Sequence, residues 1–85
     1  MLLILTDVPR VMRGFGTDHA EAIERMTVAE ARELLAAGEF GSGSMGPKVR
    51  AAADFVAGGG ARAVIGVLDR AVEALAGAAG TTVVA

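Results

Sequence analysis

Residues 43–68 have the sequence GSMGPKVRAAADFVAGGGARAVIGVL, which combines a loop, a helix and a strand. The predicted helix, over residues 47–57, has small apolar side chains at the spacing of one helical face: Val49, Ala52, Ala53 and Val56. Pro47 is tolerated at its start because the amides of a first helical turn have no intrahelical partners. The apolar run after the glycines predicts a strand over residues 62–68, of the kind found in parallel sheets.

Two further elements are predicted before this stretch. Residues 2–6 form a continuous apolar run, which predicts a strand buried on both faces. Thr27 and Glu30 have the spacing of a capping box, so a helix is expected over residues 28–37, with Gly38 ending it. The intervening residues 7–26 are less regular.

The end of the chain predicts one more helix and one more strand. Asp69 is a candidate N-cap for a helix over about residues 70–76, which Gly77 would close. Residues 81–84 predict a short strand at a sheet edge. The order of strands and helices indicates an α/β fold: a slice of a mostly parallel sheet with flanking helices, in a single unit over residues 1–85.

Composition excludes several classes of function. The net charge is −2, and the chain has no Trp, Tyr or basic stripe, which argues against a nucleic acid partner. There is no cysteine, and a lone histidine, His19, makes no zinc site, so no protein-built metal site is expected. The first residues have neither the basic start nor the length of a signal peptide or a membrane span. We therefore expect a cytoplasmic protein without membrane contact.

A glycine-rich loop over residues 38–47 leads into the start of the second predicted helix. Backbone amides and the positive end of the helix dipole make such a place suitable for phosphate. Ser42 and Ser44 add hydroxyl groups, and Lys48, the only lysine among eight basic residues, lies in the first turn. The alternative is a flexible connection between two helices, which the composition of the loop alone would favour.

Two known phosphate motifs fit this loop poorly. Residues 41–46 match the glycine pattern of a dinucleotide-binding fingerprint, with Asp69 at a suitable distance, but that fingerprint must directly follow a strand. Here a predicted helix precedes it. In a P-loop the lysine directly follows the second glycine, whereas Pro47 intervenes here.

The motif at residues 43–49 resembles the C-terminal motif of carbamate kinases, within the amino-acid kinase superfamily. The Gly-Ser-Met and Pro-Lys elements favour carbamate kinase over the other kinases of that superfamily. The resemblance covers essentially the whole chain, in order, through residues 3–8, 11, 15–16, 27–28, 30–31, 51–52, 55–56, 59–60, 63, 71, 73–75, 77 and 80–81. By resemblance, residues 3–16 correspond to a strand and a hairpin that line the nucleotide site.

The resemblance implies reversible phosphoryl transfer between ATP and carbamate, using Mg²⁺, in arginine metabolism. Lys48 would be catalytic and stabilise charge at the transferring phosphate. The amides of Gly43, Ser44 and Met45 would bind phosphate. The pocket for the base and ribose would include Thr6, Asp7, Val8 and Val11.

In carbamate kinases the carbamate site, a first phosphate loop and a second catalytic lysine precede the segment matched here. The resemblance therefore implies that residues 1–85 are the C-terminal, ATP-binding part of an amino-acid kinase domain, without the substrate lobe and inactive alone. The complete enzyme would be a homodimer that binds ATP and ADP. Three alternatives stay open: another member of the superfamily, a truncated remnant without activity, or one half of a complementing pair.

Overall fold

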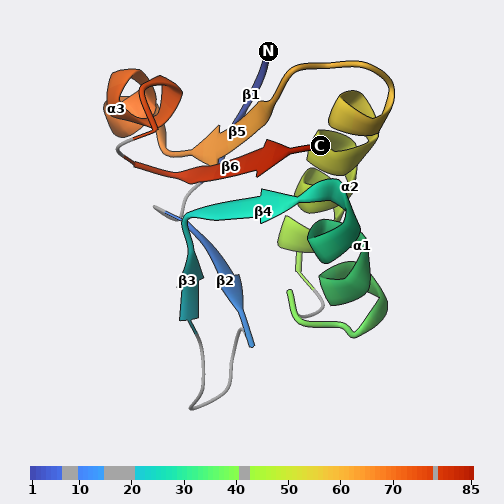
Figure 1. Cartoon of the computed structure of the whole chain (residues 1–85). Helices are drawn as coiled ribbons and strands as arrows, with labels where there is room; N and C mark the ends of the chain where they lie inside the picture. Colours follow the sequence, from blue (N-terminus) through green and yellow to red (C-terminus); the bar gives the residue numbers. More distant parts are fainter. Residues whose placement is uncertain (7–9, 15–20, 41–42, 78) are drawn as a thin grey trace.

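The computed structural model describes residues 1–6, 10–14, 21–40, 43–77 and 79–85. Figure 1 shows the elements in chain order. They are β1 (Leu2–Leu5), β2 (Val11–Arg13), β3 (Glu21–Ile23), β4 (Arg25–Thr27), α1 (Val28–Ala36), α2 (Met45–Ala57), β5 (Ala63–Gly66), the 3₁₀ turn η1 (Leu68–Arg70), α3 (Ala71–Leu75) and β6 (Thr81–Val84). The predicted helices and strands are thus confirmed, with ends shifted by at most a few residues.

The strands form a four-stranded sheet in the order β1-β5-β6-β4 and a separate two-stranded hairpin of β2 and β3. β1 is parallel to β5, β6 is antiparallel to β5, and β4 is parallel to β6. Two of the three pairings are therefore parallel, and the prediction of a mostly parallel sheet with flanking helices is confirmed. The hairpin expected by resemblance is present as the antiparallel pair of β2 and β3.

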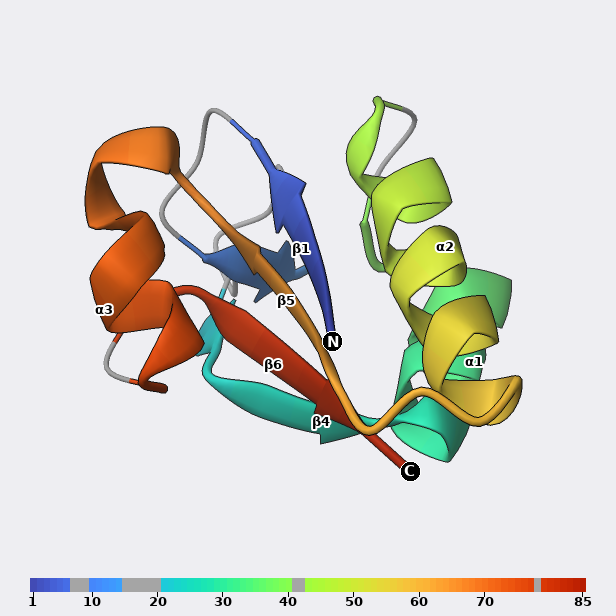
Figure 2. The same cartoon turned by 90° about the horizontal axis from the view of Figure 1, so that it is seen from above.

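The two faces of the sheet carry different helices. Ala63 and Ile65 of β5 pack into the same cluster as the buried face of α2, and alternate residues of a strand point to opposite faces. Gly66 points to the other face, where a Cβ would stand 3.3 Å from the Cβ of Ala74 in α3. Figure 2 shows α1 and α2 on one side of the sheet and α3 on the other.

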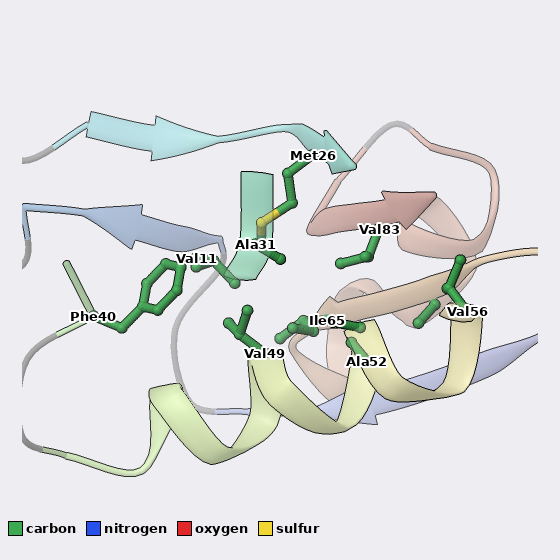
Figure 3. Packing of buried hydrophobic residues seen from close by; sticks show 11 residues of the cluster. Val11, Met26, Ala31, Phe40, Val49, Ala52, Val56, Ile65 and Val83 are labelled. Carbon is green, nitrogen blue, oxygen red and sulfur yellow. The ribbon is translucent and has the colours of Figure 1, made fainter. Parts of the chain in front are cut away.

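The main core lies between the sheet, the hairpin and the pair of α1 and α2. Figure 3 shows its side chains, which come from both ends of the chain: Val11, Met26, Ala31, Phe40, Val49, Ala52, Val56, Ile65 and Val83. The four apolar positions predicted for the buried face of α2 are all buried. Helical periodicity was therefore a sufficient guide to that face.

Three predictions from the sequence were wrong in detail. β6 lies inside the sheet, between β5 and β4, and not at an edge, because its backbone pairs on both sides. β1 lies at an edge of the described sheet and is only partly buried, with Leu5 44% exposed, because α2 covers one of its faces and only β5 pairs with it. Asp69 does not cap α3: it lies within η1, so the N-cap position falls on Arg70.

The capping box at the start of α1 is confirmed. The amide of Glu30 donates to Thr27 Oγ1 at 3.1 Å, and the amide of Thr27 donates to the Glu30 carboxylate at 3.0 Å. The hydrogen bond from the Thr27 backbone amide, followed by that involving its side chain, holds the pKa of Glu30 below its usual value.

We expect Thr27→Ala to lower the free energy of unfolding by about 1 kcal/mol, as loss of an N-cap does, while Thr27→Ser preserves it. Because the pKa of Glu30 is lowered in the folded state, its contribution is present above the unfolded pKa and is lost as pH falls through the folded pKa. Urea unfolding of both variants at neutral and acidic pH measures the change in the free energy of unfolding and its dependence on pH. If the cost of Thr27→Ala is the same at both pH values, the Thr27 hydroxyl and the Glu30 carboxylate stabilise the helix start independently of each other.

Candidate functional site: a lysine at the carboxyl edge of the sheet

Lys48 and Thr6, which are 42 residues apart, meet at one end of the sheet. The Nζ of Lys48 donates a hydrogen bond of 3.0 Å to Thr6 Oγ1, and the contact is partly buried. Thr6 directly follows β1, and its amide donates to the carbonyl oxygen of Gly66 at 2.9 Å, which extends the pairing with β5 by one residue. The backbone of Thr6 is thus fixed by the sheet, and its hydroxyl holds the lysine.

This place is the carboxyl edge of a parallel pair. β1 and β5 run in the same direction, so both end beside Thr6, and Figure 2 shows the start of α2 at the same end. In open α/β sheets, ligands bind in the crevice outside the carboxyl ends of the strands. The position of Lys48 therefore agrees with a ligand site of this class of fold.

The start of α2 lacks the features that close the start of α1. Ser44 occupies the N-cap position, but its side chain makes no capping hydrogen bond, and the first turn holds no acidic residue. The amides of a first turn have no intrahelical partner and carry partial positive charge. Within the described residues, a capping box closes the start of α1, whereas the start of α2 has no side-chain cap.

The charge of Lys48 is not neutralised within the described part of the chain, where the ion pairs are Arg10–Glu24, Arg32–Asp54 and Arg70–Glu73. An ammonium group has three donor hydrogens, and the bond to Thr6 uses one. Among the described residues, the site thus combines a cation that makes one hydrogen bond, to Thr6, with a helix start that has no side-chain cap. This arrangement suits a ligand with several anionic oxygens.

The other predicted site residues are distributed as follows. Gly43 and Ser44 are exposed, and Met45 is half-buried against the core. Val11 is fully buried, and Figure 3 shows its side chain in the core beside Phe40 and Val49. The side chain of Val11 therefore has no surface with which to contact a ligand directly. Asp7, Val8, Gly41, Ser42 and His19 lie outside the described residues.

The structure also decides between the motifs weighed for the loop. α1, and not a strand, precedes the glycine-rich segment, with its C-cap at Ala37 and Gly38 in the left-handed conformation (φ +72°). The context that a dinucleotide fingerprint requires is therefore missing.

Two hollows of roughly 300 Å³ lie over α1 and α2, share Leu35 and Arg50, and do not include Thr6 or Lys48.

The described residues contain no group of three or more His, Asp or Glu side chains that could hold a metal ion. Nor does any helix in the described ranges have the length and apolar character needed to cross a membrane. Thr81 in β6 is polar and fully buried, and the sequence analysis did not single it out. Because β6 has the sequence Thr-Thr-Val-Val, nothing in the strand itself distinguished Thr81 from Thr82.

The profile of the amino acid kinase family matches residues 1–66. The chain belongs to this family. Among its relatives, the carbamate kinase of Halobacterium salinarum is 57% identical over 82 residues, and that of Thermococcus kodakarensis is 49% identical over 84 residues. These alignments cover 96% and 99% of this chain but 27% of each relative, so the chain spans about a quarter of their length.

Solved structures agree with this placement. A carbamate kinase from Giardia lamblia bound to AMP-PNP superimposes with a TM-score of 0.91 at 38% identity, covering 98% of this chain and 29% of the other. A second Giardia carbamate kinase structure gives a TM-score of 0.87. The fold is that of the corresponding part of an amino acid kinase, and the relatives compared above are carbamate kinases.

Proposed function

We propose that this chain supplies part of the ATP site of a carbamate kinase, an enzyme that reversibly transfers a phosphoryl group between ATP and carbamate. The observation that carries the proposal is the hydrogen bond between Lys48 and Thr6 beside an uncapped helix start. Two residues proposed for the nucleotide site from different segments are thereby brought together. The support from relatives is the sequence identity to carbamate kinases and a neighbour in complex with AMP-PNP.

In this proposal Lys48 stabilises negative charge on the phosphoryl group as it leaves one oxygen and joins another. Phosphoryl transfer requires mainly that the reactants be held in line and that the charge of the equatorial oxygens be balanced. A lysine held by Thr6 is already oriented, so little reorganisation is needed when the transition state forms.

The amides at Gly43, Ser44 and Met45 would contact phosphate oxygens at the start of α2. Gly43 and Ser44 are exposed, and no described residue apart from chain neighbours lies within 4 Å of the position of a Cβ at Gly43, which would let a phosphate approach the backbone there. Thr6, Asp7 and Val8 would continue the pocket toward the ribose and base, with β2 and the buried Val11 behind them.

Mg²⁺ would bind mainly through the phosphate oxygens of ATP, since the described residues supply no cluster of acidic side chains. Mg²⁺ commonly keeps several waters and takes only one or two protein carboxylates together with substrate phosphates. When bound, it supplies additional neutralisation of phosphate charge. The residues that this chain would contribute are hydrogen-bond donors to anionic oxygen, namely Lys48 and the amides at the start of α2.

The proposal predicts a specific outcome for a chimera. Residues 1–85 replace the matching segment of the Halobacterium salinarum enzyme, to which this chain is 57% identical over 82 residues. We expect the chimera to form carbamoyl phosphate from ATP and carbamate, because the remaining length would supply the substrate site, and the 85 residues alone to form none. Formation of ADP is followed with carbamate and, as controls, with glutamate, acetylglutamate, aspartate and UMP.

Turnover by the isolated 85 residues would show that they contain a carbamate site after all. A chimera that folds and phosphorylates one of the control acceptors instead of carbamate would assign the segment to another branch of the family. A folded chimera that hydrolyses or transfers nothing would favour a non-catalytic role.

A further inference from the structure

Thr81, the first residue of β6, is a fully buried polar residue whose hydroxyl is used twice. It accepts a hydrogen bond of 2.9 Å from the amide of Val11 and donates one to the carbonyl oxygen of Ile23. Val11 lies in β2 and Ile23 in β3, and the two residues face each other in the hairpin. A single side chain therefore joins both strands of the hairpin to the main sheet.

The same residue is tied to the edge of the sheet where Lys48 lies. Thr81 pairs with Ile65 of β5, and the next residue, Gly66, accepts the amide of Thr6. Thr6 in turn holds Lys48. The hairpin and the lysine are thus both positioned relative to the carboxyl end of β5, one through Thr81 and the other through Thr6.

A second connection passes through the core. The side chain of Val11 lies in the core cluster with Phe40 and with Val49, the residue that follows Lys48 in α2. A hairpin that drifts from its place would loosen the packing beneath the first turn of α2. The hydrogen bonds of Thr81 fix the backbone of β2 at the point where its side chain supports that turn.

We propose that Thr81 is a positioning residue that holds the β2–β3 hairpin against the nucleotide site. It does not contact the nucleotide; it fixes the strand from which Val11 supports the pocket. The proposal rests on the proposed function, because it takes the carboxyl edge of β1 and β5 as the nucleotide site. If the hairpin is held in place before ATP arrives, binding does not have to supply the cost of ordering it.

The first test is hydrogen exchange by NMR on the 85-residue chain. In the wild type we expect the amide of Val11 to be as protected as the amides of β5, although its acceptor is a side chain. Thr81→Val removes the hydroxyl at nearly constant shape, so exchange at Val11 should become about 10-fold faster or more, the equivalent of one lost hydrogen bond. Thr81→Ser keeps the hydroxyl and should restore protection.

Thr82→Val is the matched control. It makes the same chemical change at the neighbouring position of β6, where the half-buried side chain points to the opposite face of the sheet and the backbone amide still donates to the carbonyl of Glu24. Protection at Val11 should be unchanged in this variant.

The second test measures kinetics in the chimera described above. Thr81→Val should raise the KM for ATP by about 10-fold with a much smaller change in kcat, because ordering of the pocket and not the chemical step is affected. Thr81→Ser and Thr82→Val should both stay close to the unmodified chimera. A purely structural role would lower the amount of folded enzyme without changing the KM.

These results distinguish a positioning role of Thr81 from a purely structural one. A rapidly exchanging Val11 amide in the wild type overturns the proposal even if Thr81→Val fails to fold. Equal KM values for Thr81→Val and Thr82→Val overturn the positioning role while leaving the proposed function intact. If the unmodified chimera does not use ATP, the proposed function fails and the positioning role falls with it, whereas the exchange data still establish whether Thr81 anchors the hairpin.

Discussion

Replacing Lys48 with alanine in the chimera is expected to lower kcat by roughly 10²–10³-fold, as loss of one preoriented electrostatic donor does. The ammonium lies 3.0 Å from Thr6 Oγ1 and has no anionic partner in the described part of the chain. Under the proposed function, this charge acts on the transferring phosphoryl group. Steady-state kinetics with ATP and carbamate measures the effect.

Two comparisons separate a catalytic role from a structural one. Lys48→Arg should restore only part of the rate, because a planar guanidinium places its charge differently from a compact ammonium. The free energy of unfolding of Lys48→Ala should change by no more than about 1 kcal/mol, since the lost hydrogen bond to Thr6 is offset by removing a cation from a helix start. A near-normal kcat for Lys48→Ala would remove Lys48 from the catalytic site.

The largest expected effect on stability is that of Gly80→Ala. Gly80 has a left-handed conformation (φ +72°), and a Cβ there would stand 2.6 Å from the carbonyl oxygen of Ile65. The left-handed backbone costs an alanine about 1–2 kcal/mol, and displacing a backbone atom adds about 1–3 kcal/mol. We expect the free energy of unfolding to fall by about 2–5 kcal/mol.

Gly38→Ala is the matched control. Gly38 has the same φ of +72°, but nothing lies within 4 Å of its Cβ position, so it should show the conformational cost alone. Denaturant unfolding of the two variants isolates the contact with Ile65, and each 1 kcal/mol should also lower Tm by roughly 4–8 °C in a domain of this size. Equal losses in both variants would mean that the approach of Gly80 to β5 is not tight.

The sequence predicted best those elements that local spacing defines. The buried face of α2 follows from four apolar residues at helical intervals, and the start of α1 follows from the capping box of Thr27 and Glu30. Both features are decided by residues within a few positions of one another. No knowledge of the distant chain was needed to place them.

The parts that the sequence did not predict depend on distant partners. β4 is three residues long and ends on the residue that caps α1, so the capping signal concealed it. β6 became an interior strand because β4 pairs with it, and the burial of Thr81 depends on Val11 and Ile23, 70 and 58 residues away. The spacing of apolar residues along a short segment does not indicate which distant strands will pair.

The candidate site was predicted in part. The resemblance to carbamate kinases selected both Lys48 and Thr6, but no spacing rule relates residues 42 positions apart, and their contact emerged only from the fold. The resemblance also selected Val11, but only the fold showed that this residue lies in the core and not at an open surface. Its role in the proposed pocket is support from beneath.

The most direct test of the account is a crystal structure of the chimera with AMP-PNP and Mg²⁺. The quantity to measure is the distance from Lys48 Nζ to the nearest phosphate oxygen. We expect a hydrogen bond of about 2.7–3.2 Å, with Thr6 adjacent and the phosphates at the start of α2. A nucleotide bound with its phosphates well beyond hydrogen-bonding distance of Lys48, while the lysine still contacts Thr6, would contradict it.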